Sequence, residues 1–577
     1  MVNDRQTHSL PSGEALDAVA QLAGLPGAGA LVEELTTLTD QTAAIFAELV
    51  GEPENPVTLV TLEQQPPQER EERLDDLGFD NAKELAARIA AWRDGRYQAL
   101  RTDQALSAFD ELTPALLEAF AASDDPMRAL TRWETLLERA PSAVTLFRLL
   151  NARPDLLERL VGALTLAPTL SDELARRPEL LDILMDADAL ELPGSVEEVA
   201  AQIERAAERP DYEALLDAIR RGTGELRFAL GSQLIEGLSD PLEVGAALSR
   251  IAQAALHLAV PAAHEEFSQR HGRIEDTELL VLGLGRFGGG ALTHASDLDM
   301  VFLFSGNVGQ RSDGARQLSA SHYYNRLATR ITAALSVPTA QGALYEVDTR
   351  LRPQGAQGPL AVSCEAFERY QQEAAWTWEH MALSRARVLV GSSQGKALVS
   401  AIMDRVLCRP RDESKLRRAI SDMRAQIAEH KTPSGPLDVK HLRGGLVDCE
   451  FLVHFLQLRG VACDGFSLAQ SHPRAYSPDL GTAIPALIVA GLLPESFRTD
   501  YDLMTRMIVS LRLLAPKGGE PPACAADGLA TSCRVSGYAS LLSEFTAARG
   551  RVCAIWNQTF GADISDTSPQ LNDNGAM

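Results

Sequence analysis

Residues 279–304 constrain the fold more than any other part of the chain. A continuous apolar run at 279–282 is followed by a glycine-rich segment at 283–290, and a second run rich in β-forming residues follows at 297–304. Short apolar runs separated by glycines are typical of buried strands joined by a tight connection. We therefore expect a small α/β unit in the middle of the chain.

Helical patterns surround this unit. Ala, Leu, Glu and Arg recur at helical spacing in 81–123 and 127–139, and helical texture returns at 364–390 and continues to about residue 560. A helix also fits 316–336, where one face carries the apolar residues Tyr324, Leu327, Ile331, Ala334 and Leu335. The polar, proline-bearing stretch 52–75 is interpreted as a linker or exposed loop.

Two similar helix starts lie in the first half. Arg153-Pro154-Asp155 is echoed by Arg177-Pro178-Glu179, and a proline followed by an acid suits the first turn of a helix.

A chain of 577 residues is too long for a single hydrophobic core, so about three or four domains are expected. The predicted class is α+β, multidomain and mostly helical.

Asp297 and Asp299 are the leading candidates for a metal site. On a strand, residues two apart project from one face, and Leu298, Met300, Phe302 and Phe304 would then face the opposite side and anchor the strand. Paired carboxylates repel one another unless a cation lies between them, and magnesium prefers such oxygen ligands. The alternative is an acidic strand end beside a tight loop. Two further D-x-D pairs, Asp186/Asp188 and Asp500/Asp502, lie in helical surroundings and are interpreted as solvated surface.

A third strand is expected at 344–352. At period two, Asp348, Arg350 and Arg352 share one face, where the carboxylate could bind a metal and the guanidinium groups phosphate oxygens. The alternative is that these three residues pair only with neighbouring charges.

The glycines favour a phosphate site. Gly285 and Gly288–Gly290 lie between the two strands, and Ser296 directly precedes Asp297. Glycine lets backbone amides approach phosphate oxygens closely. Gly283-x-Gly285-x-x-Gly288 also fits a dinucleotide-binding fingerprint, but the next strand starts too soon and opens with two acids.

The charge balance disfavours a nucleic-acid partner. Asp and Glu number 79 against 54 Lys and Arg, which gives a net charge of −25, whereas affinity for nucleic acid depends on basic residues that neutralise its phosphates.

The seven cysteines include no C-x-x-C pair, which fits a reducing, cytoplasmic setting. Neither a signal peptide nor an apolar run long enough to span a membrane is visible.

These motifs together resemble a known family. The segments are GLGRFGGGALTHASDLDMVFLF at 283–304, LYEVDTRLRPQGAQGPL at 344–360, AFERYQQEAAWTWEHMALSRARVLVG at 366–391 and DVKHLRGGLVDCEFLVHFLQLRG at 438–460. They resemble the polymerase-β-type nucleotidyltransferase domain and following helical domain of the glutamine synthetase adenylyltransferase/adenylyl-removing enzymes. Arg286 and Phe287 depart from the family, which more often has Lys and Leu there.

The resemblance implies which part of such an enzyme is present. The family has an N-terminal removing half and a C-terminal adenylylating half, and AWTWEH at 375–380 is closer to the latter. The chain thus resembles the linker plus the adenylylating half, either as a split protein or as a sequence started at an internal Met. The domains implied are a helical linker and N-terminal remnant (1–125), a helical linker domain (126–255), a nucleotidyltransferase catalytic domain (256–425), a helical regulatory domain (426–562) and a disordered tail (563–577).

The resemblance also implies a reaction. The enzyme would transfer AMP from ATP to a tyrosine of glutamine synthetase, with release of pyrophosphate, to regulate nitrogen assimilation. Asp297 and Asp299 would bind two Mg²⁺ ions, and Asp348 would share one of them. Gly285, Gly288, Gly289 and Ser296 would hold the triphosphate, and Arg350 or Arg352 would offset charge on pyrophosphate. A PII signalling protein and glutamine are the implied regulators.

Other hypotheses remain open. The chain could act on RNA or another acceptor, carry the adenylyl-removing activity, or be a non-catalytic remnant that binds glutamine synthetase or PII. Asp448 and Glu450 follow Gly444-Gly445 and are interpreted as acids at a helix start. The alternative for these two residues and for Asp438 is a role beside the nucleotide or at a domain interface. Since only one D-x-D strand with a glycine loop is visible, we expect attachment of AMP but not its removal.

Overall fold

The structure, a computed structural model, is described for most of the chain. The described residues are 14–32, 34–36, 38, 66–79, 81–123, 125–139, 143–185, 191–206, 211–460, 467–516 and 518–561. The predicted disordered tail at 563–577 and the pair Asp186/Asp188 lie outside these ranges.

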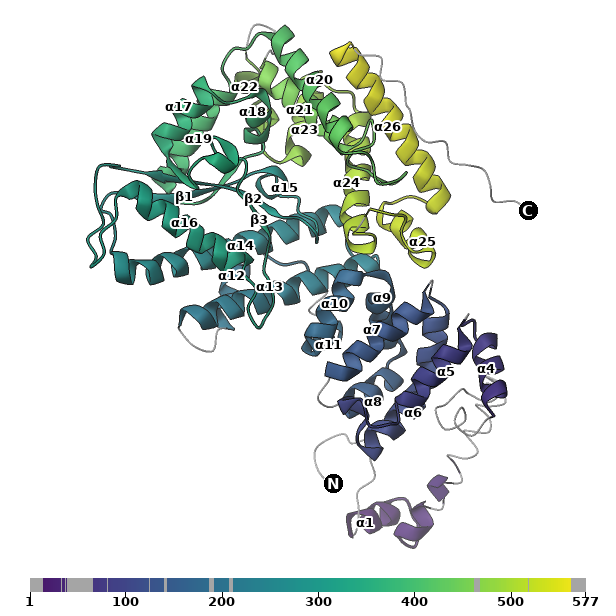
Figure 1. Ribbon diagram of the computed structural model, residues 1–577. Helices are drawn as coiled ribbons and strands as arrows, with labels where there is room; N and C mark the ends of the chain where they lie inside the picture. Colours follow the sequence, from purple (N-terminus) through teal and green to yellow (C-terminus); the bar gives the residue numbers. More distant parts are fainter. Residues whose placement is uncertain are drawn as a thin grey trace.

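The described part of the chain before residue 278 contains helices and no strand. The helices are α1 (Glu14–Leu22), α4 (Pro67–Asp76), α5 (Ala82–Ala91), α6 (Asp103–Ala121), α7 (Pro126–Arg139), α8 (Val144–Ala152), α9 (Pro154–Leu166), α10 (Pro168–Arg176), α11 (Leu181–Met185), α12 (Val196–Arg205), α13 (Tyr212–Ile235) and α14 (Pro241–His271). Pro154 starts α9 as predicted, and Pro178 starts a 3-10 turn that leads into α11. In Figure 1, α4 to α11 form a block set apart from the sheet, and the long helices α13 and α14 run toward the sheet.

A small mixed sheet forms the centre of the second part. Its strands are β1 (Glu278–Gly283), β2 (Leu298–Ser305), β3 (Val347–Asp348), β4 (Ala361–Ser363) and β5 (Arg387–Val390). The order is β3-β2-β1-β5, with β4 also paired to β2. β1 is antiparallel to β2 and β5, whereas β3 and β4 are parallel to β2.

The two central strands separate two hydrophobic cores. On β1, Leu279 and Val281 belong to one core, and Leu280 and Leu282 belong to the other. Alternate side chains of a strand point to opposite faces, so this division follows from period two. On β2 the predicted anchor residues all fall in the first core; they are Leu298, Met300, Phe302 and Phe304.

Helices cover both faces of the sheet and extend to residue 560. They are α15 (Gly285–Gly288), α16 (Ala320–Ser336), α17 (Cys364–Glu373), α18 (Thr377–Leu383), α19 (Ser393–Leu407), α20 (Glu413–His430), α21 (Leu446–Arg459), α22 (Leu468–Ser471), α23 (Leu480–Val489), α24 (Ser496–Leu514), α25 (Ala523–Ser532) and α26 (Tyr538–Phe560). The predicted apolar face of α16 is buried. The fold is thus mostly helical with a small mixed sheet, as the α+β class requires.

One acid joins the N-terminal helices to the C-terminal ones. Asp240 caps α14 by accepting a hydrogen bond from the Leu242 amide at 2.9 Å. The same carboxylate forms ion pairs with Arg506 of α24 at 3.0 Å and with Arg534 at 2.6 Å. Val509 and Leu513 of α24 also pack in the first core, so α24 contacts the N-terminal helices as well as the C-terminal ones.

Three sequence predictions need correction. The expected strand at 344–352 is only Val347–Asp348, because the Asp348 side chain accepts a hydrogen bond from the Arg350 amide at 2.8 Å and the chain turns there. The end of the predicted helical stretch 364–390 is the strand β5, which pairs with β1. The proposed linker at 52–75 contains the start of α4 from Pro67, and its earlier part to residue 65 lies outside the described residues.

None of the described helices combines the length and apolar character needed to cross a membrane.

Candidate active site

Three carboxylates meet at one edge of the sheet. Asp297 directly precedes β2, Asp299 is the second residue of β2, and Asp348 ends β3. The parallel register pairs Asp299 with Asp348 across the two strands. One carboxylate oxygen from each of the three residues lies within 4.8 Å of the others. The structure therefore brings together the three acids that the sequence analysis singled out.

The electrostatics of this group favour a cation. Burial raises the pKa of Asp299 to about 6, and the neighbouring charges of Asp297 and Asp348 add to the effect. Three carboxylates this close repel one another, and a divalent ion with oxygen ligands relieves that repulsion. The donor set is all oxygen, so it fits Mg²⁺ rather than a metal that prefers sulfur or nitrogen ligands.

Gly285 lies against the edge that carries the three carboxylates. After β1 the Leu284 amide donates a hydrogen bond to the Asp299 carbonyl at 2.9 Å, and the chain then enters α15. Gly285 has a φ of 54°, and a Cβ at this position would overlap the Asp299 carboxylate. Only glycine fits both the backbone conformation and the close approach.

Gly288 and Gly289 contact a different partner. A Cβ on Gly288 would overlap the Arg385 carbonyl, and one on Gly289 would lie 2.5 Å from the Arg385 guanidinium. These glycines also line a cavity of about 700 Å³ shared with Arg387 and Tyr501. Their predicted contact with a triphosphate stays a prediction, and the structure gives them a packing role as well.

Ser296 shapes the turn before the first carboxylate. Its hydroxyl accepts a hydrogen bond from the Thr293 amide at 2.9 Å and lies 2.9 Å from the Thr293 hydroxyl. This turn leads directly into Asp297 and fixes where β2 begins.

The two arginines after β3 have different surroundings. Arg350 forms an ion pair with Asp348, which lowers the pKa of that carboxyl, and 79% of the Arg350 side chain is exposed. Arg352 donates to the carbonyls of Thr349 at 2.8 Å and Gly358 at 3.1 Å, so it holds the loop after β3. Because the strand ends at Asp348, the expected strand face shared by Asp348, Arg350 and Arg352 is not formed.

Lys440 is a site residue that the sequence analysis did not single out. It lies in the loop after α20, and its positive charge lowers the pKa of Asp299. Burial lowers the pKa of Lys440 itself, with Glu450 opposing that effect. The Lys440 ammonium group makes no hydrogen bond or ion pair with any described residue. No local pattern in the sequence links this loop to β2.

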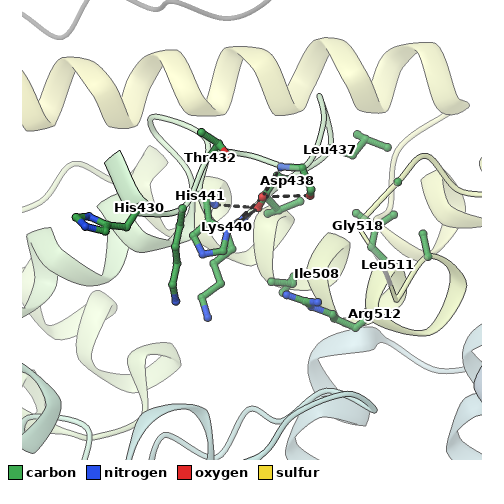
Figure 2. A pocket seen from close by; sticks show the side chains of 15 residues that line it. His430, Thr432, Leu437, Asp438, Lys440, His441, Ile508, Leu511, Arg512 and Gly518 are labelled. Atoms are coloured by element: carbon green, nitrogen blue, oxygen red, sulfur yellow. Dashed lines mark hydrogen bonds and ion pairs between the residues drawn. The ribbon is translucent and has the colours of Figure 1, made fainter. Parts of the chain in front are cut away.

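Lys440 also lines a cavity of about 390 Å³ together with Lys431, His441 and Arg512. Figure 2 shows this cavity, with Lys440 extending away from the loop that carries Asp438 and His441. Asp438 is the one carboxylate among its lining residues. Its oxygens accept hydrogen bonds from the amides of Ser434 at 3.0 Å and His441 at 3.0 Å, so it is committed to the loop. The remaining charge of the cavity is positive.

The two acids of α21 have structural partners. Asp448 is buried, forms an ion pair with Arg424, and lies 3.5 Å from Arg443. It lies in the first turn of α21, as expected of an acid at a helix start. Glu450 instead reaches Arg385 at 2.7 Å and connects α21 to the segment packed against Gly289.

The antiparallel pairing of β1 and β2 excludes the dinucleotide fingerprint. That motif requires a parallel strand after a full helix, whereas α15 is a single turn and β2 returns beside β1. Of the D-x-D pairs outside the site, Asp500 and Asp502 lie on α24 and pair with Arg551 at 2.5 Å and Arg498 at 2.7 Å. Asp502 is partly exposed, but Asp500 is buried, so the expectation of solvated surface is wrong for Asp500, whose charge is neutralised by Arg551.

Comparisons with known proteins identify relatives of this chain. Residues 157–401 match the family model of the glutamate-ammonia ligase adenylyltransferase, a range that includes all three carboxylates. The chain is 36% identical over 480 residues to a bifunctional glutamine synthetase adenylyltransferase/adenylyl-removing enzyme of Mesorhizobium japonicum, covering 80% of this chain and 47% of that protein. It is 31% identical over 572 residues to the enzyme of the same name from Rhodopseudomonas palustris, covering 98% of this chain and 57% of the relative. The chain thus spans about half the length of the curated relatives it matches.

Proposed function

We propose that this chain, which belongs to the glutamate-ammonia ligase adenylyltransferase family over residues 157–401, transfers AMP from ATP to a tyrosine hydroxyl of glutamine synthetase and releases pyrophosphate. The observation that carries the proposal is the meeting of Asp297, Asp299 and Asp348 within 4.8 Å at the β2–β3 edge. Nucleotidyl transfer develops negative charge on phosphate oxygens, and a cation held by carboxylates is suited to stabilise it.

The fold of the site supports a polymerase-β-type nucleotidyltransferase. Two antiparallel strands are joined through a glycine-rich single turn, the second strand opens with the acid pair, and a parallel neighbour adds the third acid. We assign 256–425 to this catalytic domain and 426–562 to a helical regulatory domain.

Magnesium is the proposed metal. Asp297 and Asp299 would hold both ions and Asp348 one of them, and bound Mg²⁺ would stabilise charge on the triphosphate and lower the pKa of the attacking hydroxyl. The chain's own residues then orient the substrates. Gly285 leaves room beside Asp299, and Asp348 can accept the proton of the tyrosine hydroxyl.

The positive groups around the carboxylates would bind the leaving group. Lys440 has an ammonium group with no partner among the described residues, and its charge acts on Asp299. We assign it to the polyphosphate, a role the sequence analysis gave to Arg350 or Arg352. Arg350 remains suitable because it is 79% exposed and can exchange Asp348 for a phosphate oxygen.

The proposed acceptor is supported by the names of the relatives and by the net charge of the chain. Relatives carry glutamine synthetase in their name, and a net charge of −25 favours a protein acceptor over RNA. We further propose the cytoplasm as the site of action and a PII signalling protein as a regulator.

The relatives' name combines two activities, and this chain matches about half of their length. The described residues before β1 form helices only, so they provide no second strand with paired acids. We therefore propose that the chain attaches AMP and does not remove it by phosphorolysis.

The test uses purified chain, Mg²⁺, ATP labelled at the α-phosphate and glutamine synthetase. We expect label in glutamine synthetase, and none when EDTA is present or when the tyrosines are blocked by acetylation. Label in an RNA acceptor instead would contradict the proposed acceptor. Incubation of adenylylated glutamine synthetase with phosphate, Mg²⁺ and PII, without pyrophosphate, should release no ADP; rapid ADP release would contradict the proposed direction.

A further inference from the structure

A second positively charged cavity lies between the N-terminal helices and the sheet unit. It has a volume of about 330 Å³ and is formed by residues of α7, α10 and α13 and by the loop at 339–344. Its charged lining residues are Arg139, Arg176, Arg177, Arg220, Arg227 and Glu173.

Most of these arginines have no carboxylate partner. Arg177 is paired with Glu179 at 3.2 Å and with Glu225 at 2.8 Å. The other four form no ion pair with any residue the structure describes, and their hydrogen bonds go to backbone carbonyls. Arg176, for example, donates to the Asp172 carbonyl at 3.0 Å, and Arg139 to that of Ala175 at 3.2 Å. The five guanidinium groups around this cavity outnumber its one lining carboxyl, so the cavity attracts an anion.

One buried polar group supports a ligand in this cavity. Thr223 is 1% exposed, lines the cavity, and has a hydroxyl that finds no hydrogen-bond partner. A buried polar group without a partner is costly, and a ligand oxygen would satisfy it. Burial raises the pKa of Glu173, against the effect of Arg227, Arg176 and Arg177. One such carboxyl does not neutralise the arginines around it.

The cavity is connected to both segments that carry the catalytic carboxylates. Arg227 donates to the His294 carbonyl at 2.7 Å and to the Leu344 carbonyl at 3.3 Å. His294 lies just before Asp297, and Leu344 lies just before β3 and Asp348. Arg220 binds the same loop through the Gly342 carbonyl at 3.1 Å. A ligand held by these arginines would thus contact the residues that position the metal-binding edge.

We propose that this arginine cavity is a binding site for a small oxyanion, either inorganic phosphate or a short dicarboxylate, distinct from the catalytic site. Both ligands present paired oxygens that guanidinium groups bind by parallel hydrogen bonds. The bound anion accepts hydrogen bonds from the arginines and from the Thr223 hydroxyl, and it orders the loop at 339–344. This inference does not depend on the proposed catalytic function.

Binding is tested by calorimetry on the full chain, without ATP or metal. One titration uses inorganic phosphate, one uses succinate, and sodium chloride at equal ionic strength is the control. We expect saturable binding of phosphate or succinate at one site, and the titration that shows binding identifies which anion the site takes. Absence of binding at millimolar concentrations, or equal heat with chloride, would overturn the proposal.

Substitutions locate the site. Arg176→Gln and Arg139→Gln remove exposed guanidinium groups that make no ion pair, so the fold should be kept. Each should weaken binding about 10-fold, since a hydrogen bond to a charged group contributes about 1.5–3 kcal/mol. Arg148→Gln, at an exposed arginine of α8 outside the cavity, is the matched control and should bind normally. Unchanged affinity in both cavity variants would contradict the assignment.

Hydrogen exchange tests the loop. Peptides that include residues 339–344 should exchange more slowly with the anion bound, and this protection should be lost in Arg176→Gln at the same anion concentration. Binding without protection of this segment would place the anion elsewhere and overturn the proposal.

Discussion

The acids at the β2–β3 edge and the acids at the start of α21 differ in what neutralises them. Asp448 is 1% exposed and forms an ion pair with Arg424, whose side chain is also 1% exposed, and it accepts a hydrogen bond from the Gly444 amide at 2.6 Å. Glu450 has Arg385 at 2.7 Å. At the β2–β3 edge, by contrast, Asp299 faces two other carboxylates, and its pKa is raised to about 6.

The difference separates a carboxylate that the chain itself neutralises from carboxylates that suit an external cation. A buried carboxylate that serves only packing needs a cation from the chain itself, as Asp448 has. Asp348 has Arg350, but Asp297 and Asp299 form no ion pair with any described residue, and carboxylates gathered in this way destabilise the fold, which is consistent with selection for binding an external ion. The contrast predicts opposite outcomes when the same chemical change, Asp to Asn, is made in the two regions.

The largest expected effect is on catalysis. Asp299→Asn should reduce AMP transfer by about three orders of magnitude or more, because it weakens metal binding and charge stabilisation together. The fold should be retained, since the change removes repulsion among the carboxylates. Label incorporation into glutamine synthetase and a thermal melt measure the two effects.

Asp422→Asn is the matched control for this change. Asp422 is exposed on α20 and lies outside the site, so its substitution should leave transfer unchanged. Near-normal turnover by Asp299→Asn would remove the distinction between the two acidic regions.

The second effect is on stability. Asp448→Asn should lower the free energy of unfolding by about 3–5 kcal/mol, because it leaves the Arg424 guanidinium buried without a counter-charge. Transfer per folded molecule should stay near normal. Denaturant unfolding together with an activity measurement on the folded fraction checks this, and a selective loss of activity without loss of stability would show that Asp448 acts in the reaction.

The third effect concerns the lysine between the two regions. Lys440→Met keeps most of the side-chain length but removes the charge, and it should lower kcat/KM for ATP about 10- to 100-fold. Lys415→Met, at an exposed lysine of α20, is the control and should have no effect. Equal kinetics for Lys440→Met and the wild-type chain would exclude Lys440 from the polyphosphate site.

The β1–β2 hairpin shows how much of the fold could be predicted. Alternation along 298–304 correctly predicted which β2 side chains enter the first core, because period two is a local property of the strand. The spacing of Asp297 and Asp299 also predicted their common edge. The length of β3 was not predictable from alternation, since the Asp348 side chain turns the chain through a hydrogen bond to the Arg350 amide.

The long-range parts of the site could not be predicted from patterns. The charge of Lys440 acts on Asp299 only because α18–α21 pack against one face of the sheet, which no local spacing encodes. The strand β5 was missed because its four residues follow helical sequence and are specified by pairing with β1. The partners of Asp448 likewise come from α20 and from the loop before α21.

The smallest effect is a pH dependence to which the paired region contributes one histidine. Burial, together with the charge of Arg385, lowers the pKa of His454 on α21 to about 4. Between about pH 6.5 and 4 the unfolded chain binds a proton at this histidine that the folded chain does not, so stability decreases as the pH falls through this window. His454→Gln should reduce the slope of unfolding free energy against pH by up to about 1.4 kcal/mol per pH unit. Denaturant unfolding at pH 7 and pH 5 measures the slope. Buried His380 and His294, whose pKa values are also lowered to about 4, contribute the part of the slope that remains in the variant. An unchanged slope in His454→Gln would mean that this histidine is accessible to protons in the folded chain, and that the α21 region is less tightly closed than its ion pairs indicate.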